Sequence, residues 1–173
     1  MNDIIKTLGE RSSCRSFKAE QIPMDALREI LWAGSHAPSG MNRHSAIAVA
    51  VQDADVIARL SKLNASVMSS MTDPFYGAPT VIVVMADSTV WTHIEDGSLA
   101  IGNMLNAAYS LGLGGCWIHR AKEVMATAEG RALMKKWGIP DTYVGIGNVI
   151  LGYPSGKLPA AKEPREDFAF LVD

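Results

Sequence analysis

The chain has 173 residues, of which 16 are basic and 18 acidic, and its formal net charge at neutral pH is −2. This length is most simply one domain spanning residues 1–173, with enough surface to bury for a substantial core. The near balance of charge argues against nucleic acid or an anionic membrane as the main partner. Two cysteines, Cys14 and Cys116, are too few for a disulfide-rich secreted scaffold.

The amino-terminal residues lack the basic region and the long apolar core of a secretory signal. The strongly apolar run at residues 79–86 has the length of a strand and is too short to span a membrane. We therefore expect a cytoplasmic protein in which both cysteines are reduced.

Proline and glycine mark the ends of several predicted elements. Pro23 suits the start of a helix, whereas Pro38 and Gly40 favour its end. Residues 116–118 form a short run after the glycine-rich turn 112–115. The predicted helices cover 3–9, 24–36, 53–71, 91–111 and 122–137, and the predicted strands cover 46–51, 80–86, 116–118 and 143–151.

The predicted helix at residues 91–111 is the longest, and it is rich in apolar residues around much of its circumference. Such a helix must be buried inside the domain or against another subunit. We predict an α+β architecture in which helices supply much of the core. Residues 155–165 form an extended polar arm, and the apolar segment 168–172 that follows needs a surface to dock on. This favours exchange of arms in a homodimer.

Two arginines and two serines lie within five residues near the amino terminus: Arg11, Ser12, Ser13 and Arg15. Guanidinium groups offer a planar fork of donors, and hydroxyls fill remaining oxygen positions, so this cluster suits a phosphate. A basic pair near the other end of the chain is a candidate to close the same site. Taken alone, the short run fits a solvated helix end equally well.

The motifs Arg-x-Ser-x-Arg-x-Phe at residues 11–17 and Ala-Pro-Ser-x-x-Asn at 37–42 are the most specific. They are followed by Phe-Tyr-Gly-Ala-Pro at 75–79, the helix and glycine turn, and Gly-Tyr-Pro at 152–154. In this order and spacing the chain resembles the nitroreductase family of FMN-dependent oxidoreductases, over nearly its whole length. The resemblance implies a central mixed or antiparallel sheet flanked by helices, a long buried central helix and a carboxy-terminal arm exchanged in a dimer.

The resemblance also implies roles for individual residues. The phosphate of FMN and its ribityl oxygens would be held by Arg11, Ser12, Ser13 and Arg15, with Lys162 and Arg165 closing over them. The isoalloxazine ring would be lined from the second subunit by Pro38, Ser39, Gly40 and Asn42. The backbone near flavin N5 would come from the turn and strand that contain Gly114, Gly115, His119 and Arg120.

The implied reaction passes hydride from NADH or NADPH through bound FMN to a nitroaromatic or quinone, with ping-pong kinetics. The flavin carries the chemistry, so no catalytic side chain is assigned, and the four histidines have no regular metal-ligand spacing. The alternatives are a flavin-destroying or dehalogenating member and a non-catalytic FMN-binding or electron-transfer protein.

Three features concern the substrate side of the site. His44-Ser45-Ala46 stands where many relatives carry a Gln-Pro-aromatic group, and the chain is short between residues 60 and 79, which predicts a more open pocket. His119 and Arg120 either attract an anionic group of a substrate or form an exposed pair at a strand end. Phe75 and Tyr76 either cover the pocket or pack in the core.

Overall fold

A four-stranded antiparallel sheet forms the centre of the computed structural model, which describes residues 1–172. The strand order β1-β2-β4-β3 places β1 and β3 at opposite edges. The strands are β1 (Ala46–Val51), β2 (Thr80–Asp87), β3 (Gly114–Ile118) and β4 (Tyr143–Gly152). All four predicted strands are therefore present, and their pairing is antiparallel throughout.

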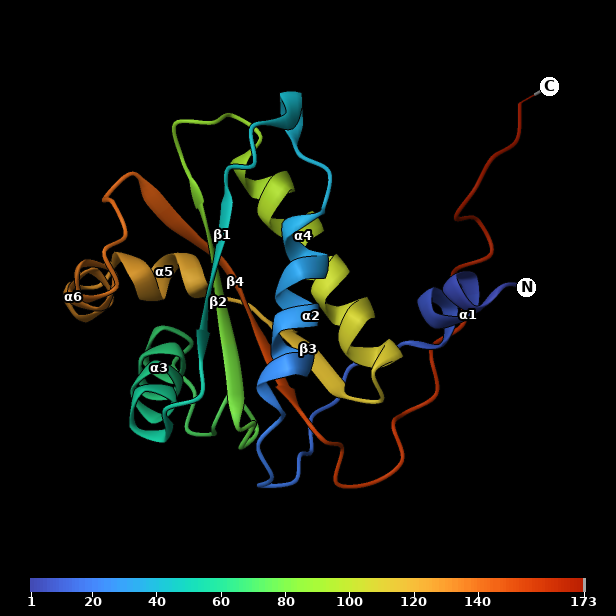
Figure 1. The fold of residues 1–173 in the computed structure, drawn as a ribbon, viewed down its shortest axis with the longest axis horizontal. Helices are drawn as coiled ribbons and strands as arrows, with labels where there is room; N and C mark the ends of the chain where they lie inside the picture. The colour runs from blue at the N-terminus through green and yellow to red at the C-terminus, as the bar shows by residue number, and fades with distance from the viewer. Residues whose placement is uncertain (173) are drawn as a thin grey trace.

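Helices cover both faces of this sheet (Figure 1). The helices α2 (Met24–Ser35) and α4 (His93–Ser110) pack on one face, with α1 (Asp3–Glu10) beyond α4. The other face is covered by α3 (Ala54–Val67), α5 (Ala121–Ala126) and α6 (Ala128–Lys136). This layering confirms the predicted α+β fold class. Residue 173, the last of the predicted domain, lies outside the described residues.

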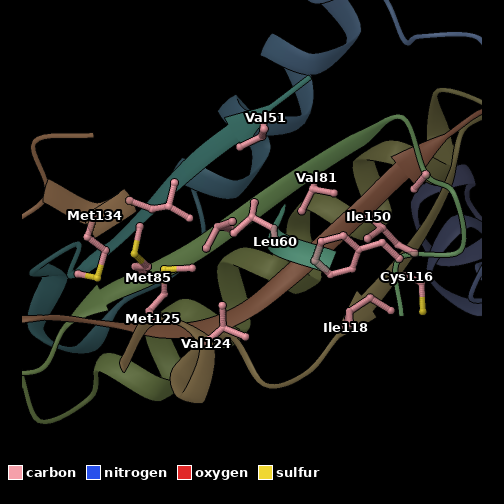
Figure 2. Close-up of a cluster of buried hydrophobic side chains, with 14 residues drawn as sticks. Val51, Leu60, Val81, Met85, Cys116, Ile118, Val124, Met125, Met134 and Ile150 are labelled. Carbon is pink, nitrogen blue, oxygen red and sulfur yellow. The ribbon is translucent and has the colours of Figure 1, made fainter. Parts of the chain in front are cut away.

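The central strand β2 is buried on both of its faces. Val81, Val83 and Met85 join a cluster with α3, α5 and α6, part of which Figure 2 shows, whereas Ile82 and Val84 pack toward α2 and α4. Side chains alternate between the two faces of a strand, so a strand buried on both sides needs an unbroken apolar run. This accounts for the composition of residues 79–86.

The long helix α4 is buried along one side and exposed along the other. Ile101, Met104 and Ala108 are buried against α2 and the sheet, while Ile94 and Leu99 are largely exposed. Within a single chain, α4 therefore buries only part of the apolar surface that the sequence indicated around this helix.

The predicted helix at residues 122–137 is wrong, because two helices occupy it. Thr127 has extended backbone angles between α5 and α6, and its Oγ1 accepts a hydrogen bond of 3.0 Å from the Gly130 amide. Thr127 therefore starts α6 as its N-cap. The predicted helix 53–71 was also too long: α3 ends at Val67, and Ser69 adopts a positive φ of 52°.

The described residues 1–172 contain neither a membrane-spanning helix nor a metal-binding cluster. No helix among them has the length and apolar character needed to cross a membrane. No group of three or more His, Cys, Asp and Glu side chains in the same range is arranged to hold a metal ion.

Candidate functional site

The Arg/Ser segment at residues 11–17 lies in extended form against the edge strand β3. Arg11 ends α1, since its amide still donates to the Thr7 carbonyl. Ser13 then forms a parallel bridge with Gly115, and the Cys14 amide donates to the Gly115 carbonyl at 3.0 Å. The motif is thus held by backbone pairing, which leaves its side chains available for other contacts.

Gly114 allows this segment to approach the strand closely. A Cβ on Gly114 would lie 2.6 Å from both Cβ and Sγ of Cys14, a distance that real Cβ atoms essentially never show. Cys14 itself is buried, and its burial raises the pKa of the thiol. Cys14 is therefore a packing residue in its protonated form rather than a reactive thiolate.

A hollow of about 300 Å³ lies between this segment and the chain that follows β4. Ser13, Arg15 and Ser16 line one side, and residues 154–159 line the other. Two hydrogen bonds close its ends: Ser12 Oγ donates to the Pro159 carbonyl at 2.6 Å, and Ser16 Oγ lies 2.5 Å from Ser155 Oγ. Hydroxyls and a guanidinium around a small hollow match the donor set for a phosphate.

Lys157 is the second basic residue on this hollow, and it was not predicted from the sequence. Its only signal was its position three residues after the Gly-Tyr-Pro motif. Lys162 and Arg165 are not among the lining residues in the described part of the chain, and Arg165 pairs with Asp167. The predicted closure by Lys162 and Arg165 is thus absent from this single chain, because the arm runs on past the hollow.

A second cleft, of about 230 Å³, adjoins the first through Arg15, which lines both. Its floor is the outer end of β3, and its walls carry Trp117, His119 and Tyr76. Met68, Ser70 and Thr72 also line this cleft, although none of them belongs to a motif that the sequence offers. Of the aromatic pair, Tyr76 is exposed on this cleft with a positive φ of 53°, whereas Phe75 is in the core.

Arg120 follows this strand end with a φ of +77°, in the left-handed region that a residue with a Cβ rarely adopts. Its guanidinium forms an ion pair with Glu123 at 2.8 Å, and this hydrogen bond lowers the pKa of Glu123. The Arg120 side chain is therefore engaged within its own helix. Of the predicted pair, His119 is the member that lines the cleft.

The loop that carries Pro38, Ser39, Gly40 and Asn42 lies at the opposite edge of the sheet, where it leads into β1. Within the loop, Gly40–Asn42 form a single turn of 3₁₀ helix, and the His44 amide donates to Ser39 Oγ at 3.0 Å. Pro38 and Ser39 border a separate hollow of about 540 Å³ between α2, α4 and β1. The two predicted parts of the site are therefore not brought together within one chain.

Known proteins of one family match this chain over most of its length. The model of the nitroreductase family matches residues 8–74 and 70–153, which together span most of the chain. The chain belongs to the nitroreductase family.

Individual nitroreductases are similar to this chain over most or all of its length. A putative NADH dehydrogenase/NAD(P)H nitroreductase of Archaeoglobus fulgidus is 30% identical over 161 residues, covering 89% of this chain and 87% of that protein. The crystal structure of a nitroreductase with bound FMN from Bacteroides fragilis superposes with a TM-score of 0.92 at 30% identity, covering 100% of each chain. A second FMN-bound nitroreductase, from Desulfitobacterium hafniense, gives a TM-score of 0.90 at 27% identity and also covers 100% of each chain. The fold inferred from the sequence motifs is confirmed by these matches.

Proposed function

We propose that this nitroreductase is an FMN-dependent oxidoreductase that takes electrons from NADH or NADPH and passes them to an oxidised acceptor such as a nitroaromatic or a quinone. The observation that carries the proposal is the position of Arg15, between a polar hollow of phosphate size and an aromatic cleft. Bound FMN would supply the hydride chemistry, as flavins do in general.

The residues around Arg15 fit the two ends of FMN. Ser13, Arg15 and Lys157 offer hydroxyl, guanidinium and ammonium donors to a phosphate. At the other end, Trp117 and His119 border a cleft suited to a flat ring. Arg11, Ser12, Gly114 and Gly115 support this site through the segment's path along β3. The FMN-bound Bacteroides fragilis relative, which is similar over its whole length, supports the same cofactor here.

A homodimer is part of the proposal because the two candidate halves lie at opposite edges of one sheet. A second copy would bring Pro38, Ser39, Gly40 and Asn42 to the ring from outside, and its arm would carry Lys162 and Arg165 toward the phosphate. The exposed apolar residues of α1, α4 and the carboxy-terminal segment supply a surface for such an association. We place the enzyme in the cytoplasm, where its two buried thiols stay reduced.

Ping-pong kinetics are expected if both substrates use the same face of the bound flavin, beside Tyr76 and His119. The nicotinamide would leave before the acceptor enters the same space. The role of these two side chains is to place each substrate against the flavin and to limit the access of water.

An anaerobic absorbance titration tests the proposal. The FMN-reconstituted protein is titrated with NADH and, separately, with NADPH. We expect stoichiometric bleaching of the flavin band, and reoxidation when a quinone or nitroaromatic is added. Bound flavin that stays oxidised with both nucleotides would reject the oxidoreductase and leave a flavin-binding protein. A chain that binds no FMN would reject the cofactor assignment itself.

A further inference from the structure

The loop between α2 and β1 contains three strained residues in four positions. Met41, Asn42 and His44 have positive φ angles of 53°, 54° and 47°. Residues with a Cβ rarely adopt this conformation, and it persists only where the surrounding structure imposes it. The loop must therefore be held from outside its own sequence.

Asp96, in the first turn of α4, provides that hold. Its Oδ1 accepts a hydrogen bond of 2.9 Å from the Gly40 amide, and its Oδ2 accepts one of 2.6 Å from Ser45 Oγ. Gly40 lies just before the strained residues and Ser45 just after them, so one carboxylate ties both ends. Thr92 Oγ1 adds a third, longer bond of 3.3 Å to Oδ2.

The carboxylate is buried, with an exposed fraction of 3%, but it is well satisfied. Burial raises the pKa of Asp96, and the hydrogen bonds from Ser45, Gly40 and Thr92 outweigh that effect, so the pKa lies below its usual value. The amino-terminal turn of a helix also favours a negative charge. Hydrogen bonds to a charged acceptor are stronger than neutral ones, so this anchor holds the loop firmly.

The absence of a side chain at Gly40 allows the loop to approach Thr92 and Asp96 closely. A Cβ on Gly40 would lie 2.3 Å from Thr92 Oγ1, so a larger residue would push the loop away from α4. The close approach and the buried carboxylate together form a fixed attachment between α4 and the loop.

We propose that Asp96 is a positioning residue for the flavin ring. It acts through the backbone of residues 39–44, and it holds Ser39 and Asn42 in the geometry that they present to the ring bound by the partner subunit. This inference rests on the proposed function, because it requires that the loop contact a flavin.

The test compares the dissociation constants of two flavins by fluorescence titration of the dimeric protein. FMN and riboflavin share the ring, but only FMN carries the phosphate. Asp96→Asn keeps the size of the side chain while it removes the charge. We expect it to weaken the binding of both flavins by about tenfold, as loss of a charge-assisted hydrogen bond does. Arg15→Ala should instead weaken FMN far more than riboflavin.

Two further variants serve as a milder substitution at the same contact and as a control. Ser45→Ala removes one bond to Asp96 at little risk to the fold, and it should weaken both flavins by about threefold, in keeping with loss of a single hydrogen bond. Asp53→Ala removes the carboxylate that caps α3, which follows β1 at the end opposite to the loop, and should leave both constants unchanged. If Asp96→Asn does not fold, Ser45→Ala decides alone.

The possible failures are distinguishable. Unchanged flavin binding in Ser45→Ala and Asp96→Asn, with FMN still lost in Arg15→Ala, would overturn the positioning role and leave the proposed function intact. If Asp96→Asn weakens the binding of FMN but not of riboflavin, the positioning role is also overturned, because the substitution would then act on the phosphate site and not on the ring. If the unaltered protein binds neither flavin, the proposed function fails.

Discussion

Arg15 lines both clefts of the candidate site, and its side chain contributes little to the stability of the fold. Its side chain is exposed, and its segment is held to β3 by backbone hydrogen bonds from neighbouring residues. Loss of its guanidinium should therefore affect ligand binding much more than folding.

We predict that Arg15→Ala weakens FMN binding by about 10- to 100-fold, because a hydrogen bond between charged groups is lost. The melting temperature of the flavin-free protein should change by no more than a degree or two, as is usual for an exposed site. Isothermal titration with FMN and thermal unfolding measure the two effects. Arg28→Ala, an exposed change on α2, is the control. Full retention of FMN by Arg15→Ala would contradict the phosphate assignment.

The buried carboxylate of Asp96 gives the stability a specific dependence on pH. Its pKa is lower in the folded protein than the value of about 3.9 found in unfolded chains, because hydrogen bonds from Ser45 and Gly40 outweigh burial. Such a group stabilises the fold above the unfolded pKa, and this contribution is lost as the pH falls through the folded pKa.

We therefore predict that Asp96→Asn flattens the acid limb of the stability profile below about pH 4. The free energy of unfolding of the unaltered protein should fall more steeply there than that of the variant, by up to about 1.4 kcal/mol per pH unit for one proton. Urea denaturation at closely spaced pH values measures both slopes. Parallel slopes in the two proteins would show that Asp96 does not titrate differently on folding.

At the scale of elements, the strands were the most predictable part of the fold. Residues 46–51 and 80–86 are compact apolar runs with turn residues on either side, and the structure places strands on them with bounds that differ by at most one residue. The helices were harder, because their ends depend on local contacts. Threonine is a common N-cap residue, so the start of α6 at Thr127 was predictable from the sequence. The end of α3 is followed by a positive φ at Ser69, which serine does not predict.

The break between α5 and α6 carries its own prediction. Thr127 Oγ1 accepts from the Gly130 amide at 3.0 Å and donates to the Val124 carbonyl at 2.7 Å, so it joins the two helices. Thr127→Ala should lower the free energy of unfolding by about 1 kcal/mol, the usual cost of an N-cap. Chemical denaturation measures this loss, with the exposed Ser66→Ala in α3 as the control. Equal stability in the two variants would show that the Thr127 cap contributes nothing measurable to stability.

At the scale of the whole molecule, the sequence indicates candidate residues for the site but not how they are arranged. Arg15 and His119 lie on adjoining clefts, and Lys157 joins Arg15 only through the folding of the chain. Pro38 and Asn42 are at the far edge of the sheet, so their proposed place beside the ring depends on a second chain. The sequence of one chain does not indicate that the loop with Pro38 and Asn42 lies at the opposite edge of the sheet from Arg15.

The carboxy-terminal segment is the most exposed apolar feature to which the proposed dimer gives a role. Phe168 and Phe170 are 80% and 81% exposed, and Leu171 and Val172 are almost fully exposed. The edge strand β1, beside the 540 Å³ hollow, lies at the opposite edge of the sheet from the phosphate hollow, and most residues that line its hollow are apolar. Full burial of one large apolar side chain contributes about 1.5–3 kcal/mol, so this segment would stabilise the proposed dimer if it docks on the second copy.

We predict that truncation after Arg165 raises the dissociation constant of the dimer by at least tenfold, since burial of even one such side chain is worth about that factor. Flavin content should fall with it on dilution, because each site would lose Pro38 and Asn42 of the other chain. Analytical ultracentrifugation with absorbance at the flavin band follows both quantities in one experiment. The double variant Phe168→Ser/Phe170→Ser keeps the length of the arm and separates the loss of apolar contact from the loss of backbone. A truncated chain that stays dimeric with one FMN per subunit would show that the helices alone form the interface, whereas a monomer with full FMN would reject the shared site.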